Sequence, residues 1–177
     1  MKIEVSILQR AIQNDSDALN LMFKQFLPED EIIYYTQYLG THGIWGTGTH
    51  SFGCLTERRV ADITVGRFGA VSYQDGYLES INSTVIYQPS KLWLYISIGI
   101  LAFVVIVTFG IGFLFIYSVT QAYYRLAKCG IVFNIKEGIP VYIFCDRKYL
   151  GRANALCRHV MLAREKRIKV IKKMHGV

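Results

Sequence analysis

The chain has 177 residues, a mass of 20.2 kDa and a formal net charge of +7 at pH 7. Outside one long apolar stretch, this length leaves room for one domain of about 130 residues. The four cysteines form no CxxC pair, which argues against a zinc site or a disulfide framework.

The positive charge lies in the second half of the chain. Residues 1–91 carry 7 Lys and Arg against 10 Asp and Glu, whereas residues 92–177 carry 13 against 3. A basic segment beside an apolar one is typical of a cytoplasmic surface that faces anionic lipid. Nucleic acid is the other possible partner of such a segment, and the poorer one for so small a chain.

Residues 1–27 show a helical pattern with a break. Apolar residues recur every three to four positions in residues 7–12 and again in residues 18–26, and Asn14 or Asp15 can cap the second segment. Pro28 ends the pattern. We expect two short helices that dock on their own domain, with a neighbouring subunit as the alternative.

Residues 31–88 change to a β pattern. Strand-like runs cover residues 32–38, 51–56, 60–65, 70–74 and 77–88, with turn signals about every 8–12 residues. Asp75-Gly76 is typical of a two-residue hairpin turn. The glycine-rich piece from Gly40 to Gly53 matches neither phosphate-binding glycine pattern, so we expect it to serve turns and close strand packing.

Residues 92–120 form the long apolar stretch. They carry no charge, and 18 of these 29 residues are Leu, Ile, Val or Phe, which predicts membrane insertion. The charge-free run extends over the 33 residues 92–124. As one helix it would reach about 50 Å, beyond the roughly 30 Å of hydrocarbon in a bilayer. A single tilted span and a short hairpin that turns at Gly110 and Gly112 both fit.

A second β pattern follows the apolar stretch, at residues 130–135 and 139–145. Asp146 is a suitable N-cap for a closing helix, whose apolar stripe recurs from Leu150 to Ala163. Residues 166–177 form a basic tail with a weak amphipathic pattern.

This order of elements resembles that of pleckstrin-homology-like (PH-like) domains: a meander of strands, a last hairpin and one C-terminal amphipathic helix. The piece from Ser51 to Val60 looks like the LTxxR strand–turn–strand motif of bacterial membrane-associated PH-like proteins, and the piece from Gly66 to Gly69 is also similar to that group. The resemblance implies an α+β fold with an antiparallel split barrel and a C-terminal helix, interrupted here by a membrane segment.

The resemblance divides the chain into five parts. These are an N-terminal helical segment at 1–27, the first part of the PH-like domain at 28–91, the membrane segment at 92–128, the second part of the domain at 129–165 and the basic tail at 166–177. Strands on both sides of the membrane segment can share one domain only if they lie on the same side of a bilayer. This favours an inserted transmembrane or re-entrant hairpin over the single span. The expected location is therefore that of an integral membrane protein, with its domain on the cytoplasmic face of a bacterial inner membrane or its equivalent.

Basic and aromatic residues are the candidate site residues, since they are the types that contact lipid headgroups. The membrane-interface candidates at the ends of the apolar stretch are Lys91, Trp93, Tyr123, Tyr124, Arg125 and Lys128, and those in turns are Arg58, Arg59 and Arg67. The candidates in the basic tail are Lys166, Arg167, Lys169, Lys172 and Lys173.

The sequence contains no convincing catalytic or metal-binding set. Cys145, Asp146 and His159 are the nearest approach to a catalytic group, and a cysteine at a strand end is more often a buried hydrophobe. His42 and His50 lack an acidic partner. We expect no enzyme activity, no metal and no cofactor.

The expected function is that of a membrane-anchored PH-like adaptor or assembly subunit, which binds other membrane proteins or itself. The expected partners are the lipid bilayer and further protein subunits, either as a homo-oligomer or in a larger membrane complex, with no nucleic acid. A membrane-shaping scaffold with a wedge-like hairpin is one alternative, and a small membrane enzyme accessory subunit is another.

Overall fold

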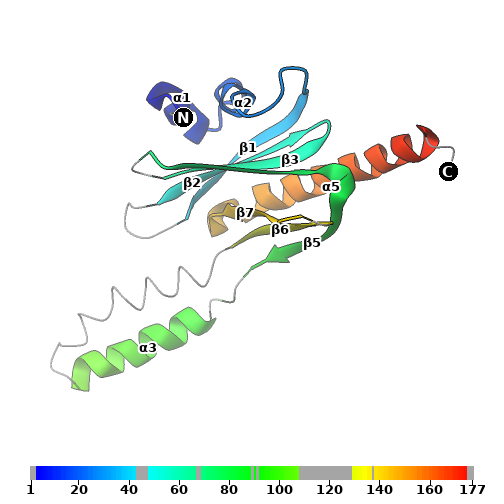
Figure 1. Ribbon diagram of the computed structural model, residues 1–177. Helices are drawn as coiled ribbons and strands as arrows, with labels where there is room; N and C mark the ends of the chain where they lie inside the picture. Colours follow the sequence, from blue (N-terminus) through cyan, green and yellow to red (C-terminus); the bar gives the residue numbers. More distant parts are fainter. Residues whose placement is uncertain are drawn as a thin grey trace.

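The computed structural model describes residues 3–42, 48–66, 69–88, 90, 92–107, 129–136 and 138–174. In this part of the chain, the fold combines two antiparallel sheets with four α-helices. Figure 1 shows the arrangement. The α-helices are α1 (Val5–Ile12), α2 (Ser16–Lys24), α3 (Leu92–Val107) and α5 (Leu150–Met174). The strands are β1 (Ile33–His42), β2 (Thr49–Thr56), β3 (Arg59–Val65), β4 (Val71–Tyr77), β5 (Ile81–Tyr87), β6 (Cys129–Ile135) and β7 (Val141–Cys145). Two short 3-10 turns are η1 (Leu78–Ser80) and η2 (Arg147–Tyr149).

The strands form two separate sheets. One has the order β1-β2-β3-β4 and the other the order β5-β6-β7, and every neighbouring pair is antiparallel. The turn η1 lies between β4 and β5 and leads the chain from the first sheet into the second. Within the described ranges no strand pair joins the two sheets. The expectation of a split barrel is therefore wrong, and the fold is α+β with two open antiparallel sheets and a C-terminal helix.

The helices α1 and α2 cover one face of the four-stranded sheet (Figure 1). Asp15 caps α2, because its Oδ1 accepts a hydrogen bond of 3.0 Å from the backbone N–H of Asp17. Leu19 and Phe23 of α2 pack with Phe52 of β2 in the same buried cluster. The two helices thus dock on their own domain.

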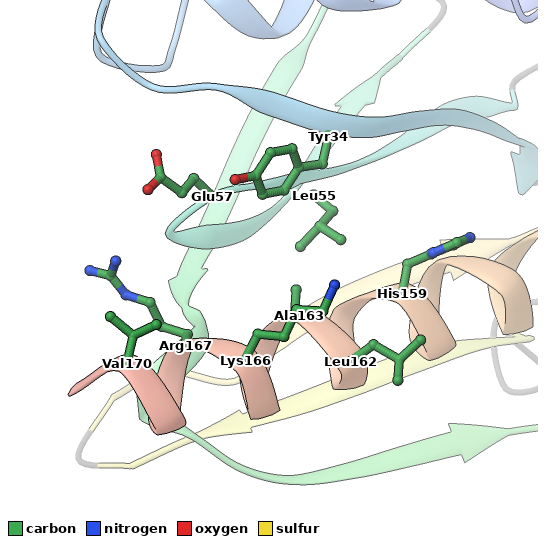
Figure 2. Close-up of a pocket in the computed structure, with 9 residues that line it drawn as sticks. All are labelled: Tyr34, Leu55, Glu57, His159, Leu162, Ala163, Lys166, Arg167 and Val170. Atoms are coloured by element: carbon green, nitrogen blue, oxygen red, sulfur yellow. The ribbon is translucent and has the colours of Figure 1, made fainter. Parts of the chain in front are cut away.

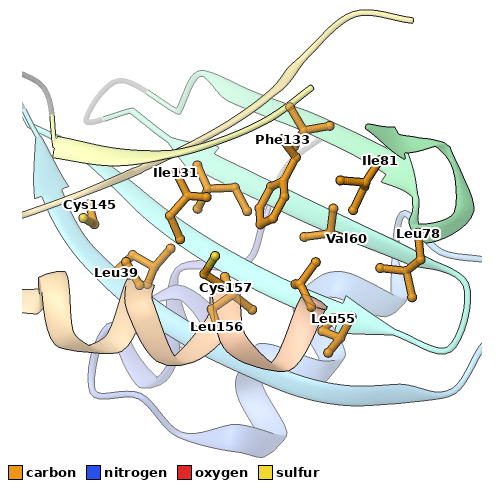
Figure 3. Close-up of a cluster of buried hydrophobic side chains, with 14 of the residues drawn as sticks. Leu39, Leu55, Val60, Leu78, Ile81, Ile131, Phe133, Cys145, Leu156 and Cys157 are labelled. Carbon is orange, nitrogen blue, oxygen red and sulfur yellow. The ribbon is translucent and has the colours of Figure 1, made fainter. Parts of the chain in front are cut away.

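The main core lies between the two sheets and α5 (Figure 3). Leu39 and Val60 come from the first sheet, Ile131 and Phe133 from the second, and Leu156 from α5. The helix lies directly on β2 at Gly53, where a Cβ atom would come within 2.5 Å of the Leu156 Cδ2 atom. A glycine in this strand therefore permits the close approach of helix and sheet.

The dipeptide Asp75-Gly76 does not form the predicted hairpin turn. Both residues lie inside β4, where Asp75 pairs with Ala61 and Gly76 pairs with Val60. A Cβ atom on Gly76 would come within 2.7 Å of the Ile135 Cδ1 atom. The glycine permits close packing of the two sheets. This tertiary contact outweighs the local preference of Asp75-Gly76 for a turn.

The apolar stretch begins as the helix α3, which has 16 residues and extends away from the rest of the domain (Figure 1). Its length corresponds to about 24 Å, short of the roughly 30 Å of bilayer hydrocarbon. Among the described residues, no helix is both long enough and apolar enough to cross a membrane. The expectations of a transmembrane or re-entrant hairpin and of an integral membrane protein are therefore wrong for the described chain. Residues 108–128 of the expected hairpin lie outside the described residues.

One carboxylate is buried inside the domain. Asp62 of β3 is 1% exposed, and its strand neighbours are Gly53 and Gln74. Its Oδ1 atom has no hydrogen-bond partner. Burial raises the pKa of Asp62 well above its usual range. The folded state therefore favours the neutral carboxylic acid.

This burial predicts that the fold loses stability as the pH rises. Folding raises the pKa of Asp62, so the contribution of this group to the free energy of unfolding is fully present below its pKa in the unfolded chain, near 4. As the pH rises toward the pKa of the folded state, this contribution is lost by up to about 1.4 kcal/mol per pH unit. We expect Asp62→Asn to flatten this pH dependence and to raise the urea midpoint at pH 8. The exposed substitution Asp30→Asn is the control and should leave the pH profile unchanged. Parallel profiles for the wild type and Asp62→Asn would contradict the interpretation.

Candidate functional site

A groove of about 460 Å³ lies between α5 and the region where β1 begins and β2 ends. Figure 2 shows the nine lining residues. One wall consists of Tyr34, Leu55 and Glu57, and the other consists of residues of α5, namely His159, Leu162, Ala163, Lys166, Arg167 and Val170. Leu55 is buried and belongs to the main core, whereas Tyr34, Leu162 and Val170 are exposed. The groove thus has an apolar base and an apolar rim that is open to a ligand.

The helix α5 extends beyond the core that its first half covers, and this extension forms one wall of the groove. Its first half buries Ala153, Leu156 and Val160. Beyond Val160 the helix continues to Met174, with its remaining residues partly or fully exposed. From His159 to Val170 the helix rises about 16 Å along the groove. An ion pair of 3.8 Å between Arg167 Nε and Glu79 Oε2 links this second half to η1.

The opposite wall depends on the turn between β2 and β3. The Thr56 hydroxyl accepts hydrogen bonds from the backbone N–H groups of Arg58, at 3.2 Å, and Arg59, at 2.9 Å. The Glu57 N–H donates to the Ile32 carbonyl at 2.9 Å, which ties the turn to the segment before β1. These bonds fix the turn that carries Leu55 and Glu57 into the groove.

A buried ionic cluster supports the same turn. Glu31, with a fully buried side chain, accepts a hydrogen bond from the Thr56 hydroxyl and lies 3.1 Å from Arg59 Nε. The Arg59 side chain is 15% exposed, and its Nη1 lies 2.6 Å from Asp75 Oδ2. The Tyr77 ring covers the guanidinium at 4.7 Å. Burial lowers the pKa of Arg59, but the hydrogen bond to Asp75 and the charge of Glu31 outweigh it and raise this pKa.

The charge beside the groove is positive. The helix α5 carries eight Lys and Arg against one Glu. Within the groove lining, Lys166 and Arg167 face a single acid, Glu57. The cations at the end of α5 also favour the helix itself, because they lie near the negative end of its dipole.

The residues predicted from the sequence fall into three groups. Lys91, Arg67, Tyr123, Tyr124, Arg125 and Lys128 lie outside the described residues, and Trp93 lies on α3 with its side chain undescribed. Arg58 and Arg59 flank the β2–β3 turn: Arg58 lies 3.6 Å from Asp30 at the surface, whereas Arg59 belongs to the buried cluster. Lys166, Arg167, Lys169, Lys172 and Lys173 all lie on α5, so the expected tail is a continuation of the closing helix. Contact of these residues with lipid stays a prediction.

The described residues offer little for nucleophilic or metal chemistry. Cys145 is buried at the end of β7, and burial raises the pKa of its thiol to about 12, which keeps the thiol protonated at neutral pH. His159 lies against the Tyr35 ring, with the ring centroids 4.8 Å apart. No group of three His, Cys, Asp or Glu side chains suited to a metal ion occurs in the described part of the chain.

Comparison with protein-family models, with curated proteins and with solved structures found no match. The function must therefore be argued from the groove, the charges and the exposed surfaces of this chain.

Sequence reasoning missed the groove and the ionic cluster. Tyr34 and Leu55 belong to strands whose alternation gives no sign of a neighbouring helix, and Glu31 and Asp75 are far apart in the sequence. One signal for the groove was available: Ile168 and Ile171 continue the helical spacing beyond Ala163, which could have extended the helix into the basic tail.

The buried cluster predicts that Glu31→Gln destabilises the protein. This change leaves the shielded Arg59 charge without one of its two partners, and removing one member of a buried ion pair typically costs about 3 kcal/mol or more. Urea unfolding measures the loss. Glu29→Gln makes the same change at an exposed site two residues earlier and should leave the midpoint unchanged. Equal midpoints for the two variants would show that the cluster does not hold the turn.

Proposed function

We propose that this protein is a non-enzymatic adaptor that binds an acidic, apolar-anchored segment of a partner protein in the groove beside α5. The observation that carries the proposal is the combination of an apolar base and rim with the cations of α5 at one open groove. Apolar anchors in a pocket supply most of the energy of such contacts, and complementary charge supplies orientation and a faster encounter.

The shape of the groove supports a polypeptide as the ligand. Exposed Leu162 and Val170, which are eight residues or about two turns apart on α5, offer apolar contacts to a segment that lies along the helix. An amphipathic segment that places one apolar face in such a groove is a common mode of peptide recognition.

The electrostatics support an acidic partner. Lys166 and Arg167 line the groove, and Lys169, Lys172 and Lys173 continue the positive charge on the same helix. A basic segment would meet like charge along this whole length, so the groove discriminates against it.

We also propose that the domain is related to PH-like modules. Support comes from the order of elements in the described chain: a four-stranded antiparallel meander, a three-stranded antiparallel sheet, and one closing helix. The LTxxR residues also have a defined task here, since Thr56 caps the β2–β3 turn and Arg59 joins the cluster beneath it.

A matched pair of peptides tests the proposal. Both are fluorescently labelled segments of about 12 residues, enough for about three helical turns, with the same leucine anchors. One carries glutamates and the other lysines. We expect the glutamate peptide to bind at least about tenfold more tightly, and its affinity to fall as salt is raised from 0.05 to 0.5 M.

Four variants locate the binding site. Leu162→Asp and Lys166→Glu should each weaken the glutamate peptide about tenfold, because they remove an apolar anchor and reverse a charge in the lining. Leu21→Asp and Lys24→Glu make the same changes on α2, which covers the opposite face of the four-stranded sheet, and should leave binding unchanged. Equal binding of the two peptides, or equal effects of the two variant pairs, would refute an acidic-segment groove beside α5.

A further inference from the structure

The exposed apolar surface of α3 is the largest feature that the groove does not explain. The helix has 16 residues and carries no charge. Its six described large side chains are between 41% and 68% exposed: Leu92, Tyr95, Ile96, Ile98, Ile100 and Phe103. A helix that is apolar on several faces is normally buried against another apolar surface.

Four of these side chains form one stripe. Leu92, Ile96, Ile100 and Phe103 follow each other at intervals of four, four and three residues. On a helix of 3.6 residues per turn they fall within about 80° of one another, which is the width of a helix–helix contact face. The stripe runs along most of α3, while Tyr95 lies about 60° and Ile98 about 120° beyond the edge of the stripe.

The start of the helix adjoins a second exposed apolar patch. Val85, Ile86 and Tyr87, at the end of β5, are about half exposed. Among the described strands β5 has one ladder partner, β6, so it forms an edge of its sheet. The strand carries no charge of the kind that usually protects such an edge. The end of β5 and the first residue of the stripe, Leu92, are therefore both exposed and both uncharged.

The charge distribution indicates what covers this surface. Between Glu79 and Arg125 the sequence contains a single charged residue, Lys91. An acidic partner of the kind that suits α5 would meet almost no basic side chain on the surface of α3. An equally charge-free apolar helix suits this surface, and a second copy of α3 is such a helix. The cations of α5, which would oppose association of two copies, lie at the other end of the domain (Figure 1).

We propose that two copies of this chain associate through α3, with the stripe Leu92–Ile96–Ile100–Phe103 of one copy packed against the same stripe of the other. The contact is isologous, since both copies use the same surface about a two-fold axis. With that axis along the helices, the exposed ends of the two β5 strands also lie near each other. This inference goes beyond the adaptor function, because the α5 groove takes no part in the contact.

Cross-linking of the full-length protein tests the contact. All four native cysteines are buried, so an added exposed cysteine is the main target of a short bis-maleimide. We expect Phe103→Cys to yield a covalent dimer at micromolar concentration, at a rate at least tenfold above that of Leu21→Cys, a similarly exposed position on α2. Equal rates for the two variants would overturn the proposal.

The mass in solution provides a second, independent measurement. Light scattering of the wild type should give twice the 20.2 kDa of one chain, and the double variant Ile96→Glu/Ile100→Glu should give the single mass. Neither residue belongs to a buried cluster, so the double variant should still unfold in one cooperative urea transition, which shows that it is folded. A wild type of single mass, a wild type without a discrete mass, or a double variant that remains dimeric would each overturn the proposal.

Discussion

The close approach of α5 to β2 is the contact on which the rest of the structure depends. Gly53 leaves space for Leu156, and the same helix face contacts residues from both sheets. Since no ladder joins the two sheets in the described chain, their relative position rests on the side chains between them and on this helix. A larger residue at position 53 would meet Leu156 Cδ2 at 2.5 Å and Leu39 Cδ1 at 3.1 Å, so the side chains between α5 and the sheet would have to repack. Fold and candidate site therefore share one packing constraint.

The basic residues of this chain perform different tasks, although they look alike in the sequence. Arg59 is enclosed by Glu31, Asp75 and the Tyr77 ring, where its charge holds a turn together. Lys166 and Arg167 stand at an open groove on the second half of α5. A buried ion pair adds little net stability compared with an apolar contact, but it disfavours other arrangements because each charge needs its partner. The buried cluster thus specifies the shape of the turn, whereas Lys166 is exposed beside the groove and Arg167 is paired with Glu79.

The domain presents two apolar surfaces that differ in charge: one carries cations and the other is uncharged. The groove beside α5 combines apolar side chains with cations, and it suits a partner that brings acidic residues. The helix α3 has no charge, and it suits a surface like itself. Two copies joined through α3 would present two grooves on one assembly, which raises the effective concentration of a partner that carries two acidic segments. The described side chains of α3 take no part in the main core, and the groove touches it through Leu55 and Ala163.

The sequence by itself determined the local structure. Alternation, turn residues and helical spacing predicted most strands, the paired helices at the N-terminus and the closing helix after Asp146, because these signals act between residues that are near in the chain. The hairpin turn at Asp75-Gly76 was wrong for the complementary reason: contacts with Ile135 and the β3 ladder outweighed a local preference. The long apolar stretch predicted membrane insertion from composition alone, whereas the described helix α3 is too short to cross a bilayer. Only the tertiary structure decided that the two sheets stay open, that Glu31 and Asp75 enclose Arg59, and that Tyr34 and Leu55 face the second half of α5. Each of these features depends on side chains that come together from distant parts of the chain, and the spacing of residues in the sequence does not predict such contacts.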